Sequence, residues 1–75
     1  MRYLSNAMRL TAAITHEGDL FVAQCLEVDV ASQGDSVEDA LANLREALEL
    51  FFEEGTGEKP RPTPIIAPID VSVGE

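Results

Sequence analysis

The segment between Ser36 and Gly55 most constrains the fold, because it has the periodicity of a helix with a single apolar face. Its apolar residues recur three or four positions apart, and mostly polar or charged residues fill the remaining surface. The apolar stripe comprises Val37, Ala40, Leu41, Leu44, Ala47, Leu48 and Phe51. Ser36 is a good N-cap, Asp39 occupies the capping-box position, and Gly55 suits a helix end. We therefore expect a helix over about Val37–Glu54 that buries this stripe against other elements.

The chain before this helix contains three segments with the alternation of β-strands. Residues 8–15 alternate apolar and polar side chains, and residues 20–26 are rich in Phe, Val and Leu. The short connection between them contains Gly18, which favours a tight hairpin turn. A third, shorter segment over residues 27–33 also alternates, and it ends at Gly34, which supplies backbone freedom for a corner.

The chain after the helix divides into a connection and one further extended segment. Residues 55–64 are rich in glycine and proline, which excludes regular structure there. Residues 65–73 are rich in β-branched side chains and alternate at their end, which predicts a fourth strand. Pro64 and Pro68 have no backbone donor, so this strand should be an edge strand or begin only after Pro68.

These elements predict one α+β domain over residues 1–75, with residues 1–7 as an N-terminal arm and the order β-β-β-α-β. Three strands meander, and a right-handed crossover through the helix returns the fourth strand beside the first. The expected architecture has two layers, in which one helix covers a four-stranded mixed sheet of order 3-2-1-4.

The size of the chain indicates that it needs a partner. A domain of 75 residues is only marginally stable alone, and a single cysteine excludes a disulfide framework. We therefore expect a dimer, a tetramer or a complex. Cys25 lies among apolar neighbours, as expected of a small buried hydrophobe in a reducing cytoplasm. No apolar run approaches the roughly 20 residues that a membrane-spanning helix requires, so no membrane association is expected.

The charge balance excludes one class of partner and favours another. The chain has 14 acidic and 5 basic residues, a formal net charge of −9. Direct nucleic-acid binding needs clustered lysine and arginine, so it is not expected here. A basic protein would be a natural complement, because opposite fields steer encounter. The acidity is equally compatible with a role in keeping a small domain in solution.

The stretch from Met8 to Glu54 resembles the HicB-like antitoxin family. That family shows a turn of the type S-Q-G-D-T after its third strand, followed by a helix of the type E-E-A-L-x-N-x-x-E-A-L. The turn here is Ser32, Gln33, Gly34, Asp35 and Ser36, and the matching helix positions are Glu38, Asp39, Ala40, Leu41, Asn43, Glu46, Ala47 and Leu48. Gln33 to Ser36 can also be explained by fold alone, as a corner followed by a helix cap.

The resemblance implies a partial ribonuclease-H-like fold and a role in toxin–antitoxin systems. HicB-like antitoxins bind and mask a small basic messenger-RNA-cleaving toxin of the HicA type. They usually carry a C-terminal ribbon-helix-helix or helix-turn-helix module that binds DNA and represses their operon. Only about 20 residues follow Gly55 here, and their composition is Pro-rich and then strand-like, so no such module is expected.

The residues predict no catalytic site, no metal site and no cofactor. A ribonuclease-H-like nuclease needs clustered carboxylates to hold divalent metals, one of them on the first strand, yet Arg9–Thr15 contains no acid. His16 at a turn and Cys25 within a strand are the other reactive side chains, and no third residue is placed to orient a base. The sequence also lacks a phosphate-binding loop and a metal-spaced Cys/His set. We therefore expect a protein that is not an enzyme.

The remaining candidates are partner-binding surfaces, formed by Glu46, Glu49, Phe52, Glu53, Ile69 and Val71. The helix acids are either a solvated face or a patch for a basic toxin. Leu50 and Phe52 lie off the main stripe, as exposed anchors or as part of a wide core. The apolar C-terminal strand either completes its own sheet or adds to the sheet of another subunit. Two functions follow: an antitoxin that neutralises a HicA-type toxin, or a stand-alone homo-oligomer without a toxin partner.

Overall fold

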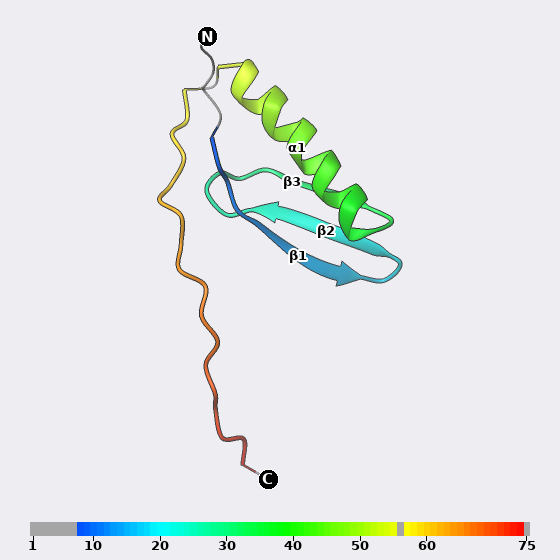
Figure 1. The fold of residues 1–75 in the computed structure, drawn as a ribbon, viewed down its shortest axis with the longest axis vertical. Coiled ribbons are helices and arrows are strands. Elements are labelled where there is room, and N and C mark those ends of the chain that lie inside the picture. The colour runs from blue at the N-terminus through cyan, green and yellow to red at the C-terminus, as the bar shows by residue number, and fades with distance from the viewer. Residues whose placement is uncertain (1–7, 56, 75) are drawn as a thin grey trace.

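The structure is a computed structural model that describes residues 8–55 and 57–74. Three strands and one helix follow one another along the chain (Figure 1): β1 (Ala12–Glu17), β2 (Leu20–Cys25), β3 (Ala31–Gly34) and α1 (Val37–Glu53). The strands form an antiparallel sheet of order β1-β2-β3, and α1 lies over one face of it. The α+β class and the order β-β-β-α are therefore confirmed. The expected arm over residues 1–7 lies outside the described residues.

The hairpin is present, but its first strand begins and ends later than the alternation predicted. β1 covers Ala12–Glu17, so that Glu17 pairs directly with Leu20 across a two-residue turn. Gly18 occupies this turn with φ of 64°, a left-handed conformation that favours glycine. Before Ala12 one further ladder hydrogen bond remains, from the amide of Leu26 to the carbonyl of Thr11 at 2.9 Å, while the amide of Thr11 donates to the side-chain carboxylate of Glu27.

The third strand also begins later than predicted, at Ala31 and not at residue 27. The chain bends over residues 26–29, because Glu27 and Val28 both turn their side chains inward and are 1% and 0% exposed. The amide of Val30 donates to the carbonyl of Val28 and thereby closes the bend. The alternation of this segment therefore belongs to a loop with two buried side chains, and pairing with β2 starts only afterwards.

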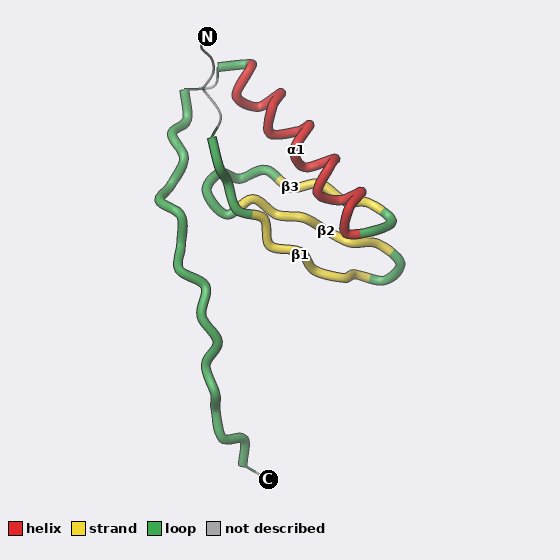
Figure 2. Tube along the Cα trace, in the orientation of Figure 1, coloured by secondary structure: helices red, strands yellow, loops and turns green. Residues whose placement is uncertain are grey.

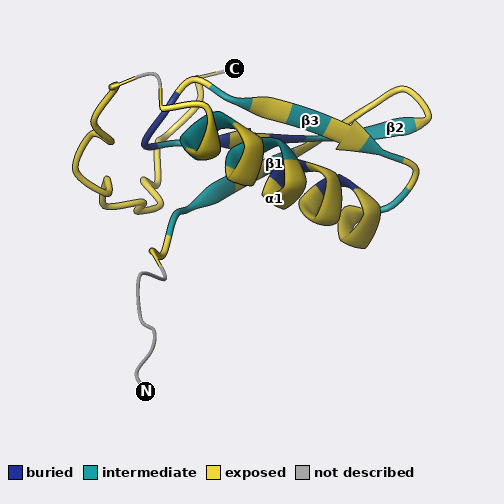
Figure 3. Ribbon diagram, turned by 90° about the horizontal axis from the view of Figure 1, so that it is seen from above, coloured by how far each residue is buried: buried dark blue, intermediate teal, exposed yellow. Residues whose placement is uncertain are grey.

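The core lies between α1 and the β2–β3 half of the sheet. Its fully buried members are Ala23, Cys25, Val28, Ala40 and Leu44, and Figure 3 shows the buried side of α1 turned toward the strands. A Cβ atom at Gly34 would lie 2.6 Å from the backbone nitrogen of Ala40. Gly34 is therefore needed for the close approach of α1 to β3. The φ of Gly34 is not in the left-handed region, so the backbone freedom expected from the sequence is not the reason for a glycine here.

The helix agrees with its prediction within one residue. The Ser36 hydroxyl accepts a hydrogen bond from the amide of Asp39 at 3.0 Å and caps the first turn. Glu54 follows the last turn, and Gly55 then takes a positive φ of 64°. The apolar stripe is only partly covered, since Leu41 remains 41% exposed. No helix in the described residues is long and apolar enough to cross a membrane.

The predicted fourth strand is not formed. Residues 57–74 contain neither strand nor helix, and the chain leaves the domain as an extended segment (Figures 1 and 2). The described sheet is therefore entirely antiparallel, and the predicted mixed sheet of order 3-2-1-4 is wrong for this chain alone. Prolines at positions 60, 62, 64 and 68 remove four backbone donors from this stretch, which weakens any pairing with its own sheet.

Candidate functional site

A buried carboxylate lies at the centre of a cluster of hydrogen bonds at one end of the sheet. Glu27 lies in the loop between β2 and β3, at the end of the sheet where β1 begins. Its Oε1 accepts from the amide of Thr11 at 2.9 Å, and its Oε2 accepts from the hydroxyls of Thr11 at 2.9 Å and Thr63 at 2.8 Å. The thiol of Cys25 donates to Oε1 at 3.5 Å. Four donors therefore surround a charge that the fold has removed from water.

These hydrogen bonds hold Glu27 in its charged form. The backbone hydrogen bond from Thr11 has the largest effect on its pKa, and burial opposes it by raising the pKa. The side-chain hydrogen bonds from Thr63, Thr11 and Cys25 lower the pKa further, so that it falls to about 2 from an ordinary 4.5. A group with so low a pKa is a poor proton donor or acceptor at neutral pH, and its geometry is that of an anchor.

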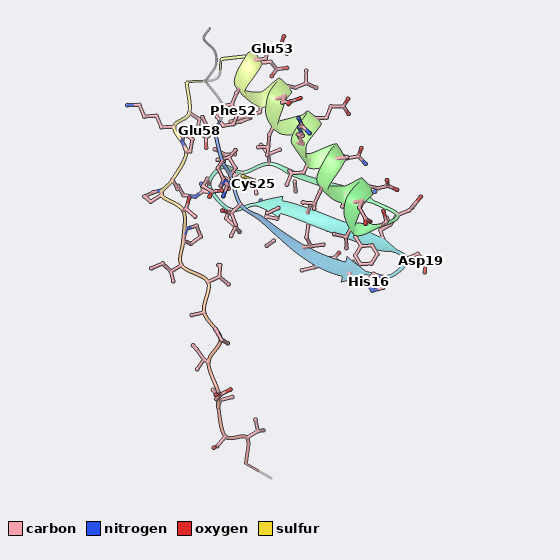
Figure 4. The ribbon with its side chains drawn as sticks, in the orientation of Figure 1. His16, Asp19, Cys25, Phe52, Glu53 and Glu58 are labelled. Atoms are coloured by element: carbon pink, nitrogen blue, oxygen red, sulfur yellow. The ribbon has the colours of Figure 1, made fainter. Side chains whose placement is uncertain are left out.

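The C-terminal segment is fastened to this same loop. The backbone amide of Arg61 donates to the carbonyl of Glu27 at 2.8 Å. The Arg61 guanidinium donates to the carbonyl of Leu26 and to Oδ1 of Asp29, each at 3.2 Å. Together with Thr63, these contacts fix residues 61–63 along the loop. Figure 4 shows Cys25 near this end of the sheet, and His16 and Asp19 at the opposite end.

The outer surface of α1 carries the predicted acidic residues. Glu46, Glu49 and Glu53 are all exposed, and their spacing places them on one side of the helix. Leu50 lies among them and is 54% exposed. Arg45 is the one basic residue of α1, and it pairs with Glu49 at 3.5 Å on the open surface. The structure therefore brings these three acids together around an exposed leucine.

Phe52 lies at the border of the acidic surface of α1, since it lines a groove together with Glu49. It is half-buried and packs edge-on against Phe51, with ring centroids 5.1 Å apart. This open groove of about 1100 Å³ lies between α1 and residues 8–10, which lead into β1. The groove is lined by Met8, Arg9, Leu10, Arg45, Leu48, Glu49 and Phe52. Of the two residues off the stripe, Leu50 is thus exposed and Phe52 lies at the margin of the core.

The C-terminal segment, which includes Ile69 and Val71, extends away from α1 (Figure 1). The large apolar side chains of this segment are between 72% and 94% exposed: Ile65, Ile66, Ile69, Val71 and Val73. The predicted partner-binding residues therefore fall on two separate surfaces, one on α1 and one on the C-terminal segment.

The signature turn fastens α1 to β3. The side-chain amide of Asn43 donates to the carbonyl of Gln33 at 2.8 Å, which joins the middle of α1 to the strand. Ser36 caps the helix and Gly34 lets it approach, while Asp35 is exposed in the bend between them. Each of these contacts is internal to the domain.

The reactive side chains that the sequence contains do not converge. His16 lies in β1 and stacks on Phe21, with ring centroids 4.3 Å apart, at the end of the sheet opposite Cys25 (Figure 4). Within residues 8–55 and 57–74, no three His, Cys, Asp or Glu side chains gather in a way that could hold a metal ion.

Sequence reasoning missed the Glu27 cluster, because two of the residues that donate to its carboxylate are far away in the chain. Thr11 and Thr63 lie 16 and 36 residues from Glu27. The available signal was an acid inside an otherwise apolar run from Cys25 to Val28. An alternating strand explains that pattern equally well, and only the fold shows that the acid points inward.

Comparison with known proteins supplies a family without a known activity. A family model described as a family of unknown function, DUF7387, matches residues 5–72. No curated protein and no solved structure matched the chain. The match shows no link to HicB-like antitoxins, and it includes both the anchored residues 61–63 and the exposed segment beyond them. Because it spans nearly the whole sequence, the chain belongs to this family of unknown function, DUF7387.

Proposed function

We propose that this protein is a non-catalytic binding module whose acidic helix surface receives a basic protein. In this proposal it acts as a HicB-like antitoxin does and masks a small basic messenger-RNA-cleaving toxin of the HicA type. The observation that carries it is the cluster of Glu46, Glu49 and Glu53 around the exposed Leu50 on the outer side of α1.

The composition of this surface suits such a partner. Interfaces commonly place an apolar anchor inside a polar rim, and Leu50 has such a rim on α1. A net charge of −9 would attract a basic protein over the whole molecular surface and raise the rate of encounter. The resemblance of the turn and helix to HicB-like antitoxins supplies the class of toxin.

A second function is a homo-oligomeric domain of the same fold with no toxin partner. The observation that favours this function is the exposure of the apolar side chains of residues 65–73, which another copy of the chain could bury. The two functions use different surfaces, so each can be tested without the other.

The test is co-expression with a small basic HicA-type protein encoded beside the gene of this chain. We expect restored growth and co-purification of the two proteins. Glu46→Lys combined with Glu53→Lys should weaken binding about tenfold or more, because two rim attractions become repulsions.

The matched control is Glu17→Lys combined with Asp19→Lys, which makes the same change in net charge on exposed acids of the hairpin. This control should lower affinity much less, since it alters only the long-range field. If the two double variants lost equal affinity for the toxin, the helix surface would not be the binding site. If co-expression failed to relieve toxicity, the protein would not be an antitoxin for this toxin.

A further inference from the structure

The outer edge of β1 carries backbone groups with no strand beside them in the described residues. The amide of Cys25 donates to the carbonyl of Val30, so the backbone of Cys25 faces away from β1. Its cross-strand partner Ala12 therefore turns its own amide and carbonyl to the outer edge. The alternation of an antiparallel strand extends this to Ile14 and His16. Such an edge is a template for a further strand.

The surface beside this edge can also bury apolar side chains. Leu10, Ala12 and Ile14 lie on the face of the sheet that α1 covers, and each is only half-buried. The helix packs over β2 and β3, so its side toward β1 is left open (Figure 1). The exposed part of Leu41 and the groove that contains Phe52 lie on that side of α1.

The C-terminal segment has the pattern that this edge requires. Ile69, Val71 and Val73 alternate with Asp70 and Ser72, so an extended chain presents one apolar and one polar side. The three apolar side chains are exposed in the structure. A strand added beside β1 would turn the apolar side under α1 and the polar side to solvent.

The path of the segment directs it away from its own β1. Residues 61–63 are fixed to the Glu27 loop. Pro64 restricts Thr63 to an extended conformation, and Pro68 restricts Ala67 in the same way, which disfavours a reversal of the chain. The segment accordingly runs away from its own sheet (Figures 1 and 2). A second copy of the chain can meet it there.

We infer that residues 69–73 of one copy form a strand beside β1 of a second copy, and that the exchange is reciprocal. The strand runs parallel to β1, with Ile69, Val71 and Val73 beside Leu10, Ala12 and Ile14. Two such exchanges close a two-fold dimer and leave no free segment.

Charge complementarity favours this register. It places Asp70 beside Thr11, two residues along the chain from Arg9 and on the same face by alternation, within reach of the long side chain of Arg9. Arg9 is exposed and precedes Leu10 at the start of this edge. In a chain with 5 basic and 14 acidic residues, a basic side chain at this place is notable, because most of the surface would repel an acidic strand.

The decisive experiment is disulfide trapping between two different variants. One full chain carries Ala13→Cys and the other carries Ser72→Cys, both on the sheet face away from α1, where neighbouring strands lie close enough for a disulfide. The native Cys25 is buried and does not compete. Oxidation of the mixture should give a covalent dimer of the two variants, and neither variant alone should give it. Absence of this product would overturn the exchange.

The mass of the full chain in solution provides an independent test. It should equal two chains, and Ile69→Asp combined with Val71→Asp should reduce it to one while the circular dichroism of the domain is retained. Leu50→Asp is the matched control, because it adds a charge at an exposed apolar residue outside the exchange and should leave the dimer intact. A monomeric parent chain, or a dimer that survives the double variant, would overturn the inference whatever the result with a toxin.

Discussion

The two halves of the C-terminal segment differ in what holds them, although neither forms regular secondary structure. Residues 57–63 are fastened by Arg61 and Thr63 to the loop that contains Glu27. No hydrogen bond or ion pair joins residues 64–74 to the other described residues, although this half carries the larger apolar side chains. Three polar contacts from Arg61 and one from Thr63, all to the loop that contains Glu27, therefore fix the path of this half, whereas the isoleucine and valine side chains do not fix the path of the other.

The comparison shows which half of the segment could still gain stability by burying side chains against a partner. Full burial of one isoleucine or valine contributes about 1.5–3 kcal/mol, and the free half exposes five such side chains. In the anchored half, Arg61 and Thr63 already make hydrogen bonds to the loop that contains Glu27. A partner is therefore expected to act on the free half and to leave the anchored half as it is.

The largest effect should come from Glu27→Gln, which tests whether the carboxylate holds the anchored half. Glutamine keeps the size of the side chain but removes its charge, and its amide group must face a donor from Thr11 or Thr63. We expect a lower midpoint of thermal unfolding than in the parent chain. We also expect faster hydrogen exchange at the amide of Arg61, which in the parent chain donates to the carbonyl of Glu27.

The control for this variant is Glu17→Gln, which removes the same charge from an exposed residue of β1. It should leave both the unfolding midpoint and the exchange at Arg61 close to those of the parent. If Glu27→Gln behaved like this control, the cluster would not be the reason for the anchored path.

The same carboxylate predicts an acid limit to stability. The pKa of Glu27 in the folded chain is about 2, below its ordinary 4.5, so the folded state holds this proton less tightly than the unfolded state. The contribution of Glu27 is therefore fully present above about pH 4.5 and is lost as the pH falls toward 2. Urea unfolding across this range should show a steeper loss for the parent than for Glu27→Gln. Parallel curves for the two proteins would contradict the assignment.

A smaller effect is expected from Thr63→Val, which removes one hydroxyl donor from the cluster and keeps the shape of the side chain. Its thermal midpoint should fall between those of the parent and Glu27→Gln, because Thr11 still donates two hydrogen bonds. Ser72→Ala makes the corresponding change in the free half and should leave the unfolding of the domain unchanged. Equal effects at the two positions would remove the distinction between the halves.

Local patterns in the sequence predicted the hairpin and the helix, because their signals are local. Gly18 marks the turn, and Ser36 and Gly55 mark the two ends of α1 within one residue. The same patterns identified Gly34 as special but gave the wrong reason. Its lack of a side chain matters because the backbone of Ala40 lies against it, and that contact exists only after the helix has packed.

The errors fall where contacts between distant residues decide the conformation. Glu27 alternates with its neighbours as a strand residue would, yet Thr11 and Thr63 draw it inward and end the pairing there. Residues 65–73 have the composition of a strand, but composition does not say which sheet will receive them. By contrast, Glu46 and Glu53 share one side of α1 because helical spacing alone determines it.

The smallest effect should come from Asp29→Asn, which tests whether charge pairing contributes to the anchored half. The Arg61 guanidinium lies 3.2 Å from Oδ1 of Asp29, but the two side chains are 50% and 83% exposed. Such pairs contribute roughly 0–1 kcal/mol, and asparagine keeps an oxygen that can still accept. We expect a loss of at most about 0.5 kcal/mol in the free energy of unfolding, and less at high salt.

The matched control for Asp29→Asn is Glu49→Gln, which weakens the exposed pair with Arg45 on α1. Both variants should differ from the parent by similar small amounts in urea unfolding at low salt. Asp29→Asn keeps the hydrogen bonds from Arg61 to the carbonyls of Glu27 and Leu26, so hydrogen exchange at the Arg61 amide should stay slow. A loss from Asp29→Asn as large as that from Glu27→Gln would mean that an exposed ion pair, and not the buried carboxylate, separates the anchored half from the free one.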